Sequence, residues 1–411
     1  MNASPPTRQP PTSLQAIVNE LFPNAPLGAS PRNPGSPTRE LILVPSAASP
    51  KLALPSGSRR AQAAALMRFS DALTWRDRAT RSAGAAALGA GGARFLTSRL
   101  TIPDGGPETI EGHLSVVLGY DVIVSLGLGS LRANQKPVLN VFDARGRSVA
   151  FAKVGDSEVS RGLVAREAEA VADVGSRSWK ILRPPRLLHF GTWNGLSILL
   201  ISALPTQPLP RLTGRGRTPV TAMDELSNAY DEGEVPLALT AWWARLMATA
   251  EHLQDLERRA ALVGALHQLQ DSHGERAVRL GAWHGDWTPW NMSSTRQSVL
   301  LWDWERFEKG VPVGLDRAHF TAAVAARKQG WSRSVLIEAL DGASGSLGTA
   351  DAPGPLTAGL YLAAITARYL DSEQGDKGDA IRSQAGTALE TLQWWLDHRI
   401  TGAPRPGRTH P

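Results

Sequence analysis

Hydrophobic and polar positions along the chain predict a strand-rich part followed by a helix-rich part. Apolar residues alternate with polar ones in three runs separated by polar, glycine-containing turns, at residues 120–129, 136–143 and 148–155. This pattern predicts an antiparallel meander. Helical spacing over residues 158–175 predicts a helix that ends at Gly175, and residues 186–205 predict two more strands. Five strands and one helix make a small α+β lobe over residues 120–204.

The pattern changes after a Pro/Gly-rich linker at residues 205–221. Apolar positions now recur at intervals of three and four, which predicts a mostly helical lobe over residues 222–400. Within it, residues 291–305 read as a β-hairpin. A short tail, residues 401–411, closes the chain.

The first 119 residues carry weaker signals. Residues 1–38 are rich in Pro, Ser and Asn, so we expect a largely disordered tail in which one apolar segment could form one or two helical turns. Residues 39–119 form an N-terminal extension that we expect to pack on the small lobe. Its predicted elements are two strands in 39–55, a helix over 59–82, a loop or loose helix over 84–95 and a short helix over 108–119.

Composition limits the chemistry and the setting. The chain of 411 residues has no cysteine, which excludes disulfides, thiolate metal sites and thiol nucleophiles. No run approaches the roughly 20 apolar residues needed to span a bilayer, and the N-terminus does not resemble a secretory signal. We therefore expect a soluble, cytoplasmic protein.

The net charge of +6 is concentrated in the N-terminal quarter. Residues 1–100 contain 12 Lys and Arg against 4 Asp and Glu, and the remainder contains 32 against 34. Such a region could bind nucleic acid, anionic lipid or a protein partner. No basic motif interleaved with aromatic residues accompanies it, which argues against nucleic acid and favours arginines on solvated faces. A protein partner for this region remains open.

The octapeptide HGDWTPWN, residues 284–291, has the spacing of a phosphoryl-transfer loop. Asp286 follows His284 by two positions and precedes Asn291 by five, the H-x-D-x-x-x-x-N arrangement of kinases. Asp303 ends an apolar strand. Its separation from Asn291 along the sequence suits a β-hairpin that would bring Asp303 back beside Asn291. An amide oxygen and a carboxylate could then share Mg²⁺, and Asp286 would accept the proton of an attacking hydroxyl.

Upstream residues could hold the phosphates of a nucleotide. Lys153 lies in an alternating strand, and Glu167 lies fourteen residues further on in the following helix, where the two side chains can form an ion pair. Glu169 is an alternative partner, but it points to a different side of the helix. The turn between the first two strands could contact phosphate through backbone amides at Gly127, Gly129 and Ser130.

The remaining residues of the loop have structural explanations. His284 is expected to hold the loop by hydrogen bonds to the backbone rather than to act as a second base. Core packing is the expected role of Trp287 and Trp290, with stacking on a substrate as the open alternative.

These motifs together resemble the aminoglycoside phosphotransferase/choline kinase family, the small-molecule branch of the protein-kinase-like fold. The matching stretches are AFAKV (151–155), AREAEAV (165–171), HGDWTPWN (284–291) and LLWDWE (300–305). The resemblance covers roughly residues 120–400. It implies a two-lobed α+β fold that binds ATP or GTP with Mg²⁺.

The resemblance also assigns roles to individual residues. Asp286 would be the catalytic base, with Asn291 and Asp303 as metal ligands. Lys153 with Glu167 would form the nucleotide-phosphate pair. Backbone groups near Ser202 and Leu204 would meet the base at the hinge, and Asp316 would brace the catalytic loop. The glycine turn departs from the protein-kinase pattern, and residues 39–119 have no counterpart in the minimal fold.

Two functions remain open at this point. The first is a kinase that phosphorylates a hydroxyl of a small molecule such as a sugar, an amino alcohol or an aminoglycoside. Residues 306–411 contain 12 basic and 11 acidic residues, so they lack the acidic bias expected for binding a polycationic aminoglycoside. The second is a non-catalytic nucleotide-binding scaffold. All the expected site positions are occupied, which favours the enzyme.

Overall fold

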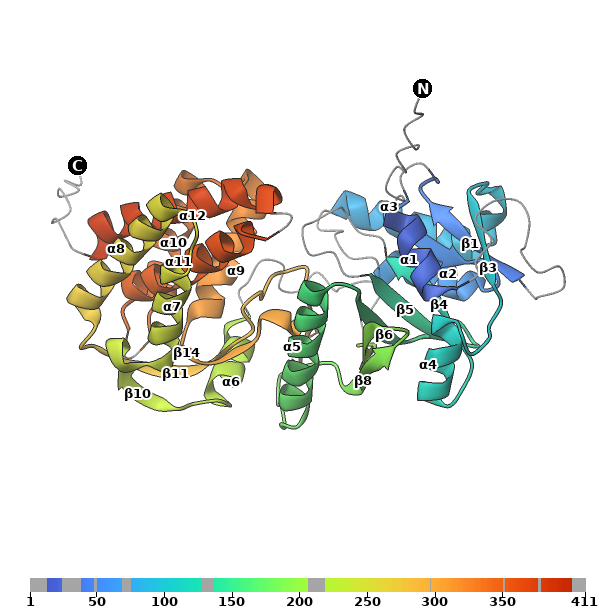
Figure 1. Cartoon of the computed structure of the whole chain (residues 1–411), viewed down its shortest axis with the longest axis horizontal. Helices are drawn as coiled ribbons and strands as arrows, with labels where there is room; N and C mark the ends of the chain where they lie inside the picture. Colours follow the sequence, from blue (N-terminus) through green and yellow to red (C-terminus); the bar gives the residue numbers. More distant parts are fainter. Residues whose placement is uncertain are drawn as a thin grey trace, which may run out of the picture. The chain divides into compact units, whose positions relative to one another are not determined.

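The chain folds into two compact units, a sheet-based unit and a mostly helical one (Figure 1). The first unit comprises residues up to 131 together with 135–172 and 185–208, and the second comprises the rest. The computed structural model describes the following residues: 13–23, 38–47, 50–68, 75–127, 137–205, 219–295, 297–349, 352–375 and 378–400. The expected α+β fold class is confirmed. No helix among these residues is both long and apolar enough to cross a bilayer.

The sheet-based unit is built on an eight-stranded antiparallel sheet. Its strands, in spatial order, are β3 (Arg99–Pro103), β1 (Thr38–Val44), β2 (Leu52–Pro55), β4 (Val122–Gly127), β5 (Val138–Asp143), β6 (Ser148–Gly155), β9 (Leu196–Ser202) and β8 (Leu187–Trp193). The predicted meander is β4–β5–β6, and the two further predicted strands are β8 and β9. Strand β3 was not predicted.

The N-terminal extension continues this sheet. Strand β2 pairs with β4, with Leu52 opposite Gly127 and Ala53 opposite Leu126. The expectation was that residues 39–119 pack on the small lobe, but their strands share its backbone hydrogen-bond ladder. Because the sheet passes without a break from β2 to β4, the extension and most of residues 120–204 form one folding unit.

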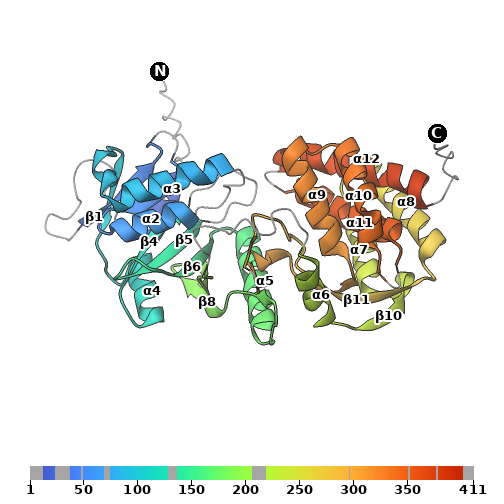
Figure 2. The same ribbon diagram turned by 180° about the vertical axis from the view of Figure 1, so that it is seen from behind.

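Two helices of the extension cover one face of the sheet. Figure 2 shows α2 (Arg59–Arg68) and α3 (Trp75–Gly89) side by side. Ala61 and Ala65 of α2 pack against buried residues of the sheet that include Leu54 and Phe142. One helix was predicted over 59–82, and residues 69–74 between α2 and α3 lie outside the described residues. Residues 84–95 were predicted to be a loop or a loose helix, and much of this stretch is helical: α3 runs to its glycine at position 89 and a 3-10 turn, η1 (Gly92–Phe95), follows.

The opposite face is covered by α1 (Ser13–Leu21) and α4 (Ile110–Leu118). Helix α5 (Glu158–Gly175) follows β6 in the chain, and its Glu167 contacts Lys153 of β6. Val18, Leu21 and Phe22 are fully buried in the same cluster as Ile110 and Leu114 of α4. Residues 13–23 contain the short helical segment that the sequence allowed for in this tail, and apolar side chains at helical spacing bury one face of α1. The rest of that tail, up to residue 37, lies outside the described residues.

The helical unit packs seven α-helices with short strands. Its helices are α6 (Val220–Asn228), α7 (Ala241–Glu251), α8 (Leu256–His273), α9 (Leu315–Gln329), α10 (Arg333–Leu347), α11 (Gly354–Glu373) and α12 (Arg382–Trp395), with short helical turns η2 (Leu237–Leu239), η3 (Trp304–Arg306), η4 (Gly378–Ala380) and η5 (Leu396–Ile400). Two three-stranded sheets have the order β10 (Gly233–Pro236), β11 (Ala277–Trp283), β14 (Glu308–Pro312) and the order β12 (Met292–Ser294), β13 (Val299–Leu301), β7 (Leu182–Arg183). The hairpin predicted at 291–305 is β12–β13. Residues 206–218 of the predicted linker and the tail 401–411 lie outside the described residues.

Helix α11 is the centre of the helical core, because it is buried on nearly all sides and packs against α7, α8, α9, α10 and α12. Trp243 of α7 and Trp395 of α12 are buried in the same cluster, and Trp394 is partly buried against it. A helix that is apolar all round must be surrounded by other elements, and α11 fits that rule.

The burial of α1 gives a direct test of the N-terminal segment. Replacing the fully buried Phe22 by Ala should lower the free energy of unfolding by about 3 kcal/mol, since the variant loses transfer free energy and leaves a cavity. The matched control is Phe95→Ala, because Phe95 is 73% exposed, and it should change stability by no more than about 0.5 kcal/mol. Urea denaturation compares the two. Equal, small effects would show that α1 is not part of the core.

Candidate active site

In the sheet-based unit, Lys153 and Glu167 form a buried ion pair. The ammonium nitrogen of Lys153 lies 2.6 Å from Oε1 of Glu167, and the side chains are 11% and 0% exposed. Ala152 and Val154 alternate with Lys153 on β6 and face the apolar cluster, so the lysine projects from the opposite face of the sheet. Glu169, the alternative partner, is exposed on α5. Burial of both charges is compensated only while the two remain paired.

The strand end proposed as the hinge is already hydrogen-bonded within its own unit. The amide of Ser202 donates to the carbonyl of Arg186, and the Ser202 hydroxyl accepts from the Arg186 amide. The guanidinium of Arg68 donates to the carbonyl of Leu204 at 3.0 Å. A carbonyl has two lone pairs, so Leu204 can accept a second bond, whereas the Ser202 amide cannot donate elsewhere without breaking this one.

Sequence reasoning missed Arg68. It ends α2, in the extension that has no counterpart in the minimal fold, and its guanidinium also lies over the ring of Phe151, 5.7 Å from the centroid. Burial lowers the pKa of Arg68 below its ordinary value. Phe151 and Lys153 project from the same face of β6, because they are two residues apart. The extension therefore contributes a charged side chain to the face that carries Lys153.

The glycine turn is only partly described. Gly127 is the last residue of β4 and pairs with Leu52 and Val138, so it lies in the sheet rather than in a turn. Gly129 and Ser130 lie outside the described residues. Phosphate contact by these three residues stays a prediction.

In the helical unit, Asp316 braces the loop at residues 284–291. It stands in the first turn of α9 and is buried, and its carboxylate oxygens accept the amides of His284 at 2.8 Å and Gly285 at 3.2 Å. Burial raises the pKa of Asp316 to about 6 from an ordinary value of 3.8. The carbonyl of Gly285 in turn accepts from the guanidinium of the half-buried Arg368 at 2.6 Å. The start of the loop is thus held from two helices.

His284 holds the loop from within. Its Nε2 lies 3.1 Å from the carbonyl of Trp302, and its Nδ1 accepts the amide of Asp286 at 3.3 Å. The ring is fully buried and meets Trp304 edge-on at 4.8 Å, and burial lowers the pKa of His284 to about 4. A neutral imidazole with both nitrogens engaged in backbone hydrogen bonds is structural, as predicted.

The carboxylate of Asp286 is fixed by two neighbours. The amide nitrogen of Asn291 donates to Oδ2 at 2.8 Å and to the Asp286 carbonyl at 3.0 Å. Nε2 of His319, on α9, lies 3.1 Å from Oδ1. The Asp286 side chain remains 36% exposed, so a ligand can reach it. The sequence motif brings Asp286 and Asn291 together as expected, whereas His319 was missed because it lies in a helix without a recognisable motif.

The hairpin brings Asn291 next to the segment that carries Asp303. The amide of Trp302 donates to the carbonyl of Asn291 at 3.0 Å, and Met292 pairs with Leu301. Asp303 has a left-handed backbone, with φ 72° and ψ 57°, a conformation that costs a non-glycine residue on the order of 1 kcal/mol. Such strain is commonly retained where it places a functional side chain.

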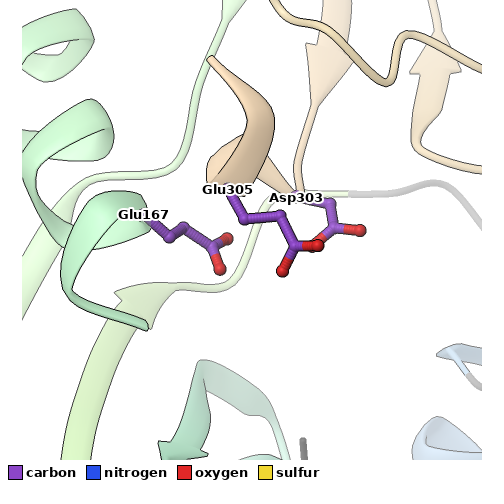
Figure 3. A group of neighbouring side chains, drawn as sticks. All are labelled: Glu167, Asp303 and Glu305. Atoms are coloured by element: carbon purple, nitrogen blue, oxygen red, sulfur yellow. The ribbon is translucent and has the colours of Figure 1, made fainter. Parts of the chain in front are cut away.

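Carboxylates of this segment lie close enough to share a cation. One oxygen of Asp303 and one of Glu305 are within 4.8 Å of each other. Figure 3 shows these two side chains together at η3, and it also draws Glu167, which belongs to the sheet-based unit. The side-chain nitrogen of Asn291 donates to Asp286, so the side-chain oxygen of Asn291 can serve as a metal ligand. Hard oxygen donors of this kind fit Mg²⁺.

The tryptophans of the loop have different surroundings. Trp287 is fully buried, and its indole N–H points to the sulfur of Met292 at 3.4 Å, so it packs in the core. Trp290 is half-buried, and the guanidinium of Arg327 lies 5.9 Å from its ring centroid. Only Trp290 retains a surface that a substrate could contact.

No protein-family model matches the chain, and no curated protein matches its sequence. Among solved structures, aminoglycoside phosphotransferase APH(4)-Ia is similar at 16% identity and a TM-score of 0.45, over 72% of this chain and 99% of that one. A choline kinase from Streptococcus pneumoniae is similar at 14% identity and a TM-score of 0.41, over 69% and 98%. Aminoglycoside 2′-phosphotransferase-IIIa, solved with GDP, is similar at 13% identity and a TM-score of 0.39, over 70% and 98%. These three structures are those of two aminoglycoside phosphotransferases and a choline kinase.

The raised pKa of Asp316 predicts a pH-dependent stability. A carboxyl group whose pKa is higher in the folded state than in the unfolded state favours folding at low pH, and this contribution is lost as the pH rises through about 6. Asp316→Asn cannot ionise. The wild type should therefore lose stability relative to this variant between about pH 4 and pH 7, by roughly 3 kcal/mol at about 1.4 kcal/mol per pKa unit. Urea denaturation at each pH checks this, and a pH-independent difference between the two proteins would contradict it.

Proposed function

We propose that the protein is a phosphotransferase that transfers the γ-phosphoryl group of ATP or GTP to a hydroxyl group of a small molecule. The observation that carries this proposal is the half-exposed carboxylate of Asp286, held by Asn291 within a loop that Asp316 and Arg368 brace. The buried Lys153–Glu167 pair supports it, because phosphoryl transfer requires fixed positive charge at the phosphates.

Each unit supplies one set of groups to this reaction. In the sheet-based unit, Lys153 would neutralise phosphate oxygens, and Glu167 would hold its ammonium group in place. In the helical unit, Asn291 and Asp303 would hold Mg²⁺, with Glu305 as a further carboxylate near it. When bound, the ion supplies charge neutralisation to the phosphates.

Asp286 would serve as the catalytic base. Its carboxylate accepts the proton of the acceptor hydroxyl while the oxygen of that hydroxyl forms a bond to the γ-phosphorus. The bond between this phosphorus and the bridging oxygen breaks, and the nucleoside diphosphate leaves with the electron pair. Positioning and charge stabilisation account for most of the rate in reactions of this type.

The acceptor is proposed to carry no strong positive charge. Near the loop, Arg327 lies over Trp290 and Arg368 contacts the carbonyl of Gly285. Arg327 beside Trp290, together with the lack of an acidic excess in residues 306–411, disfavours a polycationic aminoglycoside and favours a hydroxyl compound with little positive charge, such as a sugar.

The proposal predicts acceptor-dependent release of nucleoside diphosphate. With Mg²⁺ and ATP or GTP, the wild-type protein should release diphosphate when at least one compound of a hydroxyl panel is present, and EDTA should abolish the release. Asp286→Ala should lower turnover by about a hundredfold or more while nucleotide affinity stays nearly unchanged, because the base acts on the acceptor. Mg²⁺-dependent nucleotide binding without transfer to any acceptor would instead favour a non-catalytic nucleotide-binding scaffold.

The ion pair of the sheet-based unit predicts a contrast between two glutamates of one helix. Glu167→Gln replaces the carboxylate that lies 2.6 Å from the buried ammonium of Lys153 by a neutral amide, so stability should fall by about 3 kcal/mol and phosphoryl transfer should fall at least tenfold. Glu169→Gln is the matched control, because Glu169 is exposed on the same helix, and it should change neither property. Denaturation and initial rates measure both variants. Equal effects of the two substitutions on stability and on rate would show that Glu167 has no role in the site.

A further inference from the structure

The second neighbour of the Asp286 carboxylate comes from a different element. His319 lies on α9, and its Nε2 is 3.1 Å from Oδ1 of Asp286. Its side chain is 6% exposed, while that of Asp286 is 36% exposed. A ligand can therefore reach the aspartate, whereas the histidine touches it from the protein interior.

The hydrogen-bond chemistry fixes the direction of this contact. An ionised carboxylate only accepts, so Nε2 of His319 must carry the hydrogen. Nδ1 of the same ring lies 3.4 Å from the hydroxyl of Tyr361 on α11. Burial raises the pKa of Tyr361 well above its ordinary value, so this hydroxyl keeps its hydrogen and can donate it to Nδ1. The direction of donation thus runs from Tyr361 to His319 to Asp286.

One face of α9 contacts both the loop backbone and the side chain of Asp286. Asp316 and His319 are three residues apart, which places them on the same side of the helix. Asp316 accepts the amides of His284 and Gly285, and His319 meets the carboxylate one residue further along the loop. Since Asn291 already donates to Oδ2, the two oxygens of Asp286 each have one fixed donor.

We propose that His319 is a positioning residue that orients the Asp286 carboxylate toward the acceptor hydroxyl, with Tyr361 fixing the imidazole. This rests on the proposed function, because it takes Asp286 as the base. A carboxylate held by donors on both oxygens cannot rotate away, and its remaining lone pairs point in defined directions. Misplacement of a catalytic group by about 1 Å can cost about a hundredfold in rate.

The test compares variants that keep or remove the donor. Leu at position 319 removes the N–H, whereas Gln can place an amide N–H toward Oδ1. His319→Leu should lower kcat by about tenfold to a hundredfold, with KM for the nucleotide within about twofold of wild type. His319→Gln should recover most of that loss, and Tyr361→Phe should give an intermediate kcat. Initial rates with Mg²⁺ and ATP or GTP measure this, using hydrolysis to water if no acceptor has been found.

A double-mutant cycle separates positioning from a general structural role. In the Asp286→Asn background, His319→Leu should lower kcat by no more than about twofold further, since it acts through the carboxylate. Equal losses in both backgrounds, or equal losses for His319→Leu and His319→Gln, would overturn the proposal. If His319→Leu does not fold, His319→Gln and Tyr361→Phe carry the same comparison against wild type. Absence of any phosphoryl transfer by the wild type would overturn the proposed function, whereas an active wild type with unaffected variants would overturn only the role of His319.

Discussion

The loop at residues 284–291 depends on one buried carboxylate. Asp316 accepts hydrogen bonds from two consecutive amides, those of His284 and Gly285, and so fixes the backbone immediately before Asp286. A buried, ionised carboxylate is tolerated only where hydrogen-bond donors replace the water that it loses. For Asp316, the two amides and the nearby positive charge of Arg368 supply this compensation. The exposed carboxylate of Asp286 then takes its direction from a backbone that cannot shift.

Helix α9, which carries Asp316, also contacts the side chain of Asp286. In α9, Asp316 holds the loop backbone and His319 contacts the Asp286 carboxylate, while Tyr361 and Arg368 of α11 support His319 and Gly285. Helix α11 is buried on nearly all sides, so the hydrophobic core of this unit positions the loop. Tight packing makes such positions costly to displace.

Apart from Asp316, whose role came from the family resemblance, the residues that sequence reasoning identified share a property: local structure alone brings them together. Asp286 and Asn291 lie in one loop, and the hairpin that follows brings Asn291 opposite Trp302. Lys153 and Glu167 lie on consecutive elements, so alternation in a strand and helical periodicity suffice to predict their contact.

The residues that were missed depend on distant packing. His319 is 33 positions from Asp286, and Arg68 is 136 positions from Leu204. Nothing in an ordinary helix marks a side chain that another element will meet. The short N-terminal helix was expected only as one or two turns, because its burial depends on contacts with the sheet-based unit that the local sequence does not show. For the fold, the meander could be predicted, but the pairing of β2 with β4 is non-local and could not.

The most direct test of the central claim is the chemical identity of the product. ³¹P NMR of the protein with Mg²⁺, ATP or GTP and a mixture of small hydroxyl compounds should show a new phosphomonoester signal that grows with the nucleoside diphosphate signals, and Asp286→Asn should suppress it. A spectrum in which the nucleotide stays unchanged with every acceptor, although it binds, would contradict the account.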